Sequence, residues 1–366
     1  VYVTFVPIFI PPFISLFNKY KVDRRMLVTV INAGLQIGYV CIPVGIGAVY
    51  MGIVQSAMAD NGLDGVGLYQ VAAANLPILL ALILGGIVFF AAGFNPVQVY
   101  KLIFLGAFGS GEAILTTLSY ATPLIFTGLA FAFAQHAKVM NLGTEGQLYV
   151  GAMVAALIGG YLPPLPRILF VPLILVVSCL CAGCYAGIAG FLSNRFGANM
   201  VIVTLMQNYV AQLFCSYLVN NVFVDDQGIA RTAALPQQAR IGKLMEGHYL
   251  SASILIGVAL VAVVWFLLNR TRLGYRLHFV GSNPACAETA GINTKRMMLI
   301  TLLISGALAG FCGATQVMGV QYRFTDGFSS GYGFEGIAVA ALAGNNPVTV
   351  LLSAILWGGL KSGASE

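Results

Sequence analysis

Residues 141–147 read Asn-Leu-Gly-Thr-Glu-Gly-Gln and place one carboxylate, that of Glu145, between two long apolar segments. A charge so close to hydrocarbon on both sides is costly and is usually functional. The flanking glycines and Asn141 indicate that one helix ends here and another begins. Broken helices at membrane depth are tolerated where they line a cavity, which is the architecture of a transport site.

The composition of the chain indicates the same class of protein. Of its 366 residues, 59% are hydrophobic and 8% are charged, whereas soluble domains carry about 25% charged residues. The pairs Gly183/Gly187 and Gly306/Gly310 have the spacing that lets membrane helices pack closely. The net charge of +6 does not indicate a nucleic-acid partner. Because no H-E-x-x-H or Walker A motif is present, we expect no catalytic residue, metal or cofactor on this chain.

Apolar stretches divide the chain into about ten segments, some too short to cross a membrane alone. They are residues 1–17, 26–54, 71–93, 113–137, 146–161, 168–192, 199–222, 249–268, 297–320, 334–344 and 347–360. We expect an all-α, polytopic membrane protein with broken helices. The predicted parts are N-terminal helices with an amphipathic segment (1–112), a first core half (113–268), a cytoplasmic loop (269–297) and a second core half (298–366) whose last helix is incomplete.

Charge in the loops predicts the orientation of the chain in the membrane. The loop 269–296 carries five lysines and arginines against one carboxylate, which predicts a cytoplasmic position. The loop 223–248 is balanced in charge, which suits the outer face, and residues 94–112 fall outside by the same count. The first 70 residues break this pattern, since their basic residues also fall outside; a hairpin within 26–54 is one explanation.

Two segments resemble each other faintly. Residues 128–140, GLAFAFAQHAKVM, align with 306–318, GALAGFCGATQVM, and each is followed by Glu-Gly, at Glu145 and at Glu335. The charge count predicts that the two helices run in opposite directions. Inverted repeats with interrupted helices point to a substrate site between them. Chance similarity is the alternative, because membrane helices use few residue types.

The chemistry of the broken helix allows two interpretations. Asn141 and Thr144 are candidate N-caps for a helix beginning at Glu145. Glu145 and Gln147 then face a central cavity and bind or gate a polar solute. Alternatively, Glu145 caps the half-helix or pairs with Lys138, which would hold the break in shape.

Two further polar features allow the same pair of interpretations. Glu335 follows the glycine-rich stretch 329–334. Thr204, Asn208 and Gln212 recur at every fourth position of an apolar helix and form one polar stripe. Such a stripe either joins helices or binds substrate.

The loop 272–292 holds a short helix of small residues that begins at Pro284 and stops at Gly291, with Glu288 exposed. Proline in the first turn and glycine after the end are the usual boundaries of a helix. A short surface helix between two membrane spans is either an inert connection or a knob that docks on a soluble partner.

Several motifs in the same order give the chain a family resemblance. They are NPVQVYKLIFLGAFGS (95–110), TPLIFTGLAFAFA (122–134), NLGTEGQLYVGA (141–152), FGANMVIVTLMQNYVA (196–211), LHFVGSNPACAETAGI (277–292) and FEGIAVAALAGNNP (334–347). The chain resembles the permease subunit of bacterial ATP-binding-cassette (ABC) importers, in the nucleoside and simple-sugar branch of the ribose and branched-chain amino-acid permeases. Residues 1–70 do not match this pattern, and the family's final helix is absent after residue 360.

The resemblance implies a permease in the bacterial inner membrane that translocates a nucleoside or related small polar solute. It implies ABC ATPase subunits that bind Mg-ATP, a second related permease (a heterodimer rather than a homodimer) and an extracytoplasmic binding lipoprotein. Segment 281–291 would be the coupling helix that contacts the ATPase, through Gly281, Asn283, Pro284, Ala287, Glu288 and Gly291. The candidates for the substrate pathway are Asn141, Glu145, Gln147, Thr204, Asn208 and Glu335.

Two other classes of function stay open at this point. An ion-gradient-driven transporter or channel would use Glu145 and Glu335 as proton or ion sites. An intramembrane hydrolase would use Ser329, which lies in the G-x-S-x-G pattern of residues 327–331 but lacks a nearby histidine. Neither class explains segment 281–291. The sequence does not distinguish nucleosides from sugars, riboflavin-like compounds or amino acids as the substrate.

Overall fold

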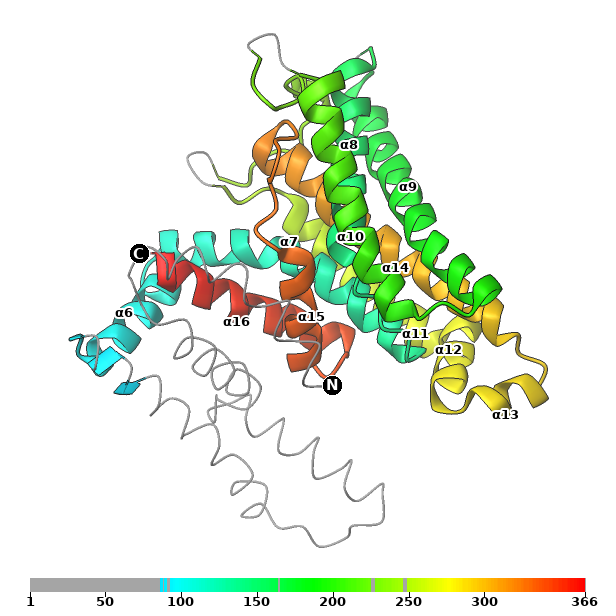
Figure 1. The fold of residues 1–366 in the computed structure, drawn as a ribbon. Coiled ribbons are helices and arrows are strands. Elements are labelled where there is room, and N and C mark those ends of the chain that lie inside the picture. The colour runs from blue at the N-terminus through cyan, green and yellow to red at the C-terminus, as the bar shows by residue number, and fades with distance from the viewer. Residues whose placement is uncertain are drawn as a thin grey trace, which may run out of the picture. The chain divides into compact units, whose positions relative to one another are not determined.

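The computed structural model describes residues 86–87, 89–90, 93–163, 165–224, 228–245 and 249–365. These residues form helices joined by loops (Figure 1), and within the same ranges the only β-structure is two isolated bridges. The all-α prediction is therefore confirmed for this part of the chain. The predicted segments 1–17 and 26–54, and most of 71–93, lie outside the described residues. Residues Ile103–Glu366 form one compact unit.

The helices of the described residues are α6 (Pro96–Phe108), α7 (Gly111–His136), α8 (Thr144–Tyr161), α9 (Arg167–Phe196), α10 (Met200–Tyr217), α11 (Ser253–Arg270), α12 (Arg272–Ser282), α13 (Pro284–Thr289), α14 (Thr294–Gln316), α15 (Tyr332–Leu342) and α16 (Pro347–Ser365), with π-helical turns η1 (Leu218–Val222) and η3 (Val317–Gln321) and a 3₁₀ turn η2 (Gln237–Ala239). Helices α7 to α11 and α14 to α16 agree closely with the apolar segments predicted from residue 113 onward. Six of the described helices are long and apolar enough to cross a membrane: α7, α9, α10 with η1, α11, α14 with η3, and α16. The predicted total of about ten segments is not confirmed by these six.

Local sequence signals explain where the long helices begin and end. The side chains of Ser110, Asn199 and Asn293 cap α7, α10 and α14, each by accepting a hydrogen bond from a backbone N–H of the first turn. Such caps satisfy N–H groups that have no partner within the helix. Gly197 ends α9 in the left-handed conformation, with φ of 68°, which glycine adopts without steric cost.

Helix α14 lies at the centre of the unit, where it packs against α7, α8 and α9. Its glycines allow this close packing, as their spacing predicted. A Cβ on Gly310 would meet the backbone oxygen of Ser178 in α9 at 3.1 Å, and a Cβ on Gly183 of α9 would meet that of Leu303 at 2.7 Å. Small residues at such crossings let helix backbones approach each other closely.

The first and last helices of the unit pack in a reciprocal pattern. Helix α8 packs on α14 and α15 packs on α7, while α9 packs on α14 and α16 packs on α7. Exchanging the triplet α7–α8–α9 with α14–α15–α16 therefore leaves these four pairs of neighbours unchanged.

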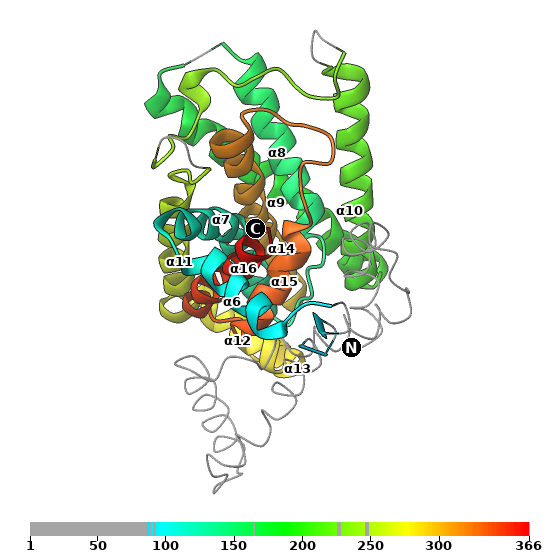
Figure 2. The same ribbon diagram turned by 90° about the vertical axis from the view of Figure 1, so that its left-hand side faces the viewer.

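Helices α12 and α13 lie at one end of the bundle, and the loops that precede α11 and α15 lie at the other (Figures 1 and 2). Helix α7 ends near α12, where the rings of His136 and His278 are 4.7 Å apart. Helix α9 ends near the start of α14, where the side chain of Asn194 donates to the backbone oxygen of Lys295 at 2.9 Å. This end carries exposed basic residues from five segments, namely Lys138, Arg195, Arg270, Arg272, Arg276, Lys295 and Arg296.

Candidate functional site

The predicted helix break at residues 141–147 is confirmed. Helix α7 ends at His136, Lys138 takes the left-handed conformation with φ of 52°, and α8 begins at Thr144. The residues between them are not helical, although most are buried. Irregular backbone at membrane depth must find its hydrogen bonds within the protein. The hydrogen-bond partners of this segment therefore show which helices hold the break in place.

Asn141 uses all four hydrogen-bonding positions of its side-chain amide inside the protein. Its Nδ2 donates to Oε1 of Gln147 at 3.0 Å and to Oγ of Ser305 in α14 at 2.8 Å. Its Oδ1 accepts from the backbone N–H of Gly143 and from Nε2 of Gln147, both at 3.0 Å. An amide side chain has two donors and one oxygen with two lone pairs. Asn141 therefore ties the break to α14 and offers no free polar group in this conformation.

Helix α10 holds the other side of the break. Oδ1 of Asn208 accepts from the N–H of Gly146 at 2.8 Å, and its Nδ2 donates to the backbone oxygen of Leu142 at 2.7 Å. Oγ1 of Thr204 accepts from the N–H of Leu142 at 3.3 Å. Of the two interpretations of the polar stripe, these two residues support the one in which it joins helices. Among the described residues, the third member of the stripe, Gln212, makes no hydrogen bond with the break; it lines a hollow instead.

The capping predicted for α8 is wrong. The N-cap residue is Gly143, which has no side chain to accept a hydrogen bond. Asn141 is drawn instead to Gln147 and α14, as described above. Thr144 is the first helical residue, and its hydroxyl donates to the backbone oxygen of Gly333 at 3.0 Å.

Glu145 lies where the N-termini of two helices meet. Its side chain is buried, with 2% exposed, and its Oε2 accepts from the N–H of Gly333, the second residue of α15, at 2.6 Å. A Cβ on Gly333 would collide with the backbone of Glu145. Lys138 is exposed, so the alternative in which it pairs with Glu145 is wrong. The positive ends of α8 and α15 stabilise the carboxylate in place of a cation.

Glu335 has a different environment. It forms an ion pair with Lys361 of α16 at 2.8 Å, and the two side chains are 20% and 25% exposed. The ammonium group also lies 5.1 Å from the ring centre of Tyr332 and 5.9 Å from that of Tyr120. Lys361 was not singled out from the sequence, although it directly follows the last apolar run. Among the described residues, no cluster of three or more His, Cys, Asp and Glu side chains could hold a metal ion.

The short helix predicted after Pro284 is confirmed as α13. Asn283 caps it by accepting from the N–H of Cys286 at 3.2 Å, and Gly291 ends it with φ of 80°. Ala287 is buried, and so is Gly281, where a Cβ would collide with the backbone oxygen of His136 at the end of α7.

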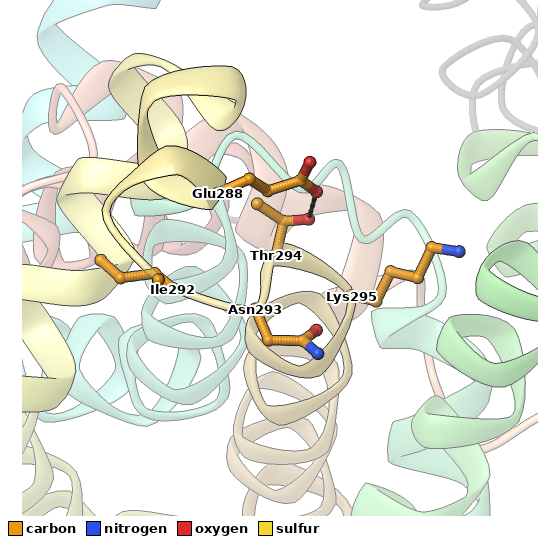
Figure 3. Close-up of a pocket in the computed structure, with 6 residues that line it drawn as sticks. Glu288, Ile292, Asn293, Thr294 and Lys295 are labelled. Carbon is orange, nitrogen blue, oxygen red and sulfur yellow. Dashed lines mark hydrogen bonds between the residues drawn. The ribbon is translucent and has the colours of Figure 1, made fainter.

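The outer surface of α13 is exposed, and Glu288 lies on it. Its carboxylate accepts a short hydrogen bond from the hydroxyl of Thr294, whereas the side chain of Lys295 points away (Figure 3). A hollow of about 300 Å³ lies beside this pair. It is lined by Glu288, Gly291, Ile292, Asn293, Thr294 and Lys295.

Residues 113–366 match the family described as the branched-chain amino acid transport system / permease component. The chain belongs to this family. The permease is therefore a multi-pass protein of the inner membrane, in agreement with its six apolar helices. The match covers the break, Glu335 and the α12–α13 segment.

Curated relatives extend the similarity toward the N-terminus. The permease is 34% identical to the guanosine ABC transporter permease protein NupP of Bacillus subtilis, over 79% of this chain and 84% of the relative. It is 30% identical to the nucleoside ABC transporter permease protein NupB of Lactococcus lactis, over 79% and 82%. It is 32% identical to the glucose ABC transporter permease protein TsgB13 of Haloferax volcanii, over 80% and 79%.

The first two relatives have counterparts with the same transporter description in their own organisms. These counterparts, NupQ and NupC, are each 27% identical to the permease over 67% of this chain. Permeases of this kind thus occur in pairs. No solved structure matches the chain.

Proposed function

We propose that this chain is the permease subunit of an ATP-driven importer that translocates nucleosides. The observation that carries the proposal is the exposed helix α13, held by buried Gly281 and Ala287 at the basic end of the bundle. Similarity to two nucleoside permeases over 79% of the chain supports the substrate class.

The exposed basic residues around α12 and α13 support a cytoplasmic position for this end of the bundle. A cytoplasmic ATPase would then contact the exposed surface of α13. The exposed residues there include Asn283, Pro284, Glu288 and Gly291. Mg-ATP would bind to that partner, because the permease has no Walker A motif.

Helix α13 is linked to both helix breaks through its neighbouring helices, so that a movement imposed by the ATPase could reach them. Helix α12 packs against the end of α7, which precedes the break before α8, and α13 leads directly into α14, which precedes η3 and α15. Helices α8 and α15 meet at Glu145 and Gly333, and this contact is called the joint. A displacement of α13 would therefore act on both helices of the joint. Alternating access of this kind moves two rigid halves around a fixed site.

The reciprocal packing of α7–α8–α9 and α14–α15–α16 supports an inverted repeat. In both copies a long helix is interrupted, and a second helix begins shortly before a carboxylate, Glu145 or Glu335. In this proposal the six pathway candidates shape the region where the two copies meet. A second, related permease would complete the importer, as the paired relatives suggest, and an extracytoplasmic binding lipoprotein would deliver the solute.

The test is affinity purification of the tagged permease from its native membranes in mild detergent, followed by mass spectrometry. We expect a Walker-motif ATPase and a second permease to co-purify, and the ATPase to be lost when residues 283–288 are replaced by a glycine-serine linker. Recovery of the permease without any nucleotide-binding protein, from membranes in which it is intact, would overturn the proposal and favour the gradient-driven alternative.

A further inference from the structure

A second hollow, of about 300 Å³, lies between α8, α10 and the loop before α15. Helix α10 begins near the end of α9, at the α12–α13 end of the bundle, so its second half lies away from that end. The lining residues are Tyr149, Tyr209, Gln212, Leu213, Ser216, Asp326 and Gly327. The four from α10 share one helix face, because they are spaced at i, i+3, i+4 and i+7. If the α12–α13 end is cytoplasmic, the hollow faces the side from which solute arrives.

Two aromatic rings face the hollow from different helices. Tyr149 is 6% exposed and is held in an aromatic cluster, with its ring centre 4.9 Å from that of Phe328 and 6.1 Å from that of Phe324. Tyr209 is 56% exposed, and among the described residues its ring has no aromatic partner. The ring of Tyr149 is therefore held in place by its aromatic neighbours, whereas the ring of Tyr209 is not. The exposed ring of Tyr209 is the one that can stack on a nucleobase, a contact that contributes about 1–3 kcal/mol, while Tyr149 lines the wall of the hollow.

The polar groups of the hollow are only partly used within the protein. Oδ2 of Asp326 accepts from Oγ of Ser216 at 2.8 Å and from Nδ2 of Asn220 at 3.0 Å. Its Oδ1 accepts no hydrogen bond from the described residues, and the half-buried amide of Gln212 makes none with them either. A carboxylate fixed through one oxygen is ready to accept hydrogen bonds from hydroxyl groups through the other.

We infer that this hollow binds a nucleoside as it enters the permease, with the base against Tyr149 and Tyr209 and the ribose hydroxyls at Oδ1 of Asp326. Gln212 meets the polar edge of the base. The inference rests on the proposed function and names the site at which its substrate is recognised. The volume lies at the lower end of the range for small-molecule pockets, about 300–1,000 Å³.

The same chemistry discriminates against other solutes of the family. A hexose has hydroxyl groups for Asp326 but no planar ring to stack on Tyr209. A nucleotide brings an anionic phosphate toward a carboxylate, and like charges across an interface oppose binding.

The experiment measures binding of tritiated guanosine to the assembled complex of both permeases and the ATPase in lipid nanodiscs. The complex is prepared without the binding protein, so that the signal reports the membrane subunits. Tyr209→Ala is expected to raise the Kd about tenfold or more. Tyr217→Ala is the matched control, since Tyr217 is 58% exposed on the same helix but does not line the hollow.

A second arm tests Asp326 with 2′,3′-dideoxyguanosine as competitor. The wild-type complex is expected to bind guanosine about tenfold more tightly than this analogue, because a hydrogen bond to a charged group contributes about 1.5–3 kcal/mol. In Asp326→Asn this preference should weaken to a few-fold, because the amide oxygen accepts hydrogen bonds without the charge of the carboxylate, while stacking of the base is retained.

Uptake of guanosine by intact cells, measured in parallel, separates the two claims. Uptake by the wild type together with weakened binding in Tyr209→Ala, but not in Tyr217→Ala, supports the site. Uptake by the wild type with unchanged binding in both Tyr209→Ala and Asp326→Asn overturns the site and leaves the proposed function standing. Absence of nucleoside uptake from wild-type cells, with the complex assembled, overturns the substrate class and the site with it.

Discussion

The joint between α8 and α15 and the α12–α13 segment are both built around a helix start, yet they use their polar groups in opposite ways. At the joint, Asn141, Glu145 and Asn208 are buried and bonded to backbone and side chains of the same chain. On α13, Asn283 caps the helix while Glu288 and most of the surface stay exposed. The joint is thus held by hydrogen bonds within the permease, whereas the surface of α13 is available to a partner protein. Substitutions at the joint should change folding, and substitutions on α13 should change assembly.

The largest effect is expected from Gly333→Val at the joint. A side chain at this position collides with the backbone of Glu145, and overpacking of a close contact costs about 1–3 kcal/mol or more. We expect little folded protein in the membrane, measured by fluorescence-detected size-exclusion chromatography after heating. Gly111→Val is the control, because a Cβ there meets nothing within 4 Å. Equal thermal stability of the two variants would contradict the close approach of α8 and α15.

Glu288→Arg tests the other region. We expect nucleoside uptake to be abolished while the permease stays folded in the membrane, because exposed substitutions change stability by only about 0.5 kcal/mol. Uptake by cells and the melting temperature of the purified chain are measured together. Glu112→Arg, an exposed reversal in the first turn of α7, should leave uptake normal. Normal uptake in Glu288→Arg would refute docking through α13.

Substitutions of Glu145 distinguish a structural carboxylate from a proton site. Glu145→Ala leaves the buried N–H of Gly333 without its acceptor, which costs about 1–3 kcal/mol. Glu145→Gln keeps an acceptor at the same place, and we expect it to retain uptake within about twofold and most of the stability. If Glu145→Gln instead abolishes uptake while the protein remains stable, the carboxylate carries a proton and its role is not only structural.

The smallest effect is expected at the Glu335–Lys361 pair, which is partly exposed. Lys361→Met leaves Glu335 without its cation and should lower stability by about 1 kcal/mol. Adding Glu335→Gln removes the unpaired charge and should restore most of that loss, as in a double-mutant cycle. Thermal unfolding of the wild type, of Lys361→Met, of Glu335→Gln and of the double variant completes the cycle. Additive losses would show that the pair does not interact.

The sequence predicted the fold of the described region well because its signals are local. Apolar length set the helices, Pro284 and Gly291 set the limits of α13, and the polar residues at 141–147 marked the break. The faint repeat between 128–140 and 306–318 also pointed to the two helices that precede the interruptions.

The partners of the site residues were not predictable in the same way. The Glu145 carboxylate accepts a hydrogen bond from Gly333, which lies 188 positions later in the chain. The spacing of residues within one segment carries no information on such a contact. The caps assigned to Asn141 and Thr144 were wrong because tertiary hydrogen bonds outweighed the local preference. The sequence placed Gln212 in the polar stripe with Thr204 and Asn208 but not among the pathway candidates, and in the structure it lines the second hollow.

In the proposed mechanism, ATP hydrolysis by a partner subunit drives transport through this permease. This mechanism is tested most directly by nucleoside uptake into right-side-out membrane vesicles loaded with ATP or with a non-hydrolysable analogue, each with and without a protonophore. We predict uptake with ATP that is insensitive to the protonophore, and none with the analogue. Uptake that proceeds with the analogue and collapses with the protonophore would contradict the account and identify a gradient-driven transporter.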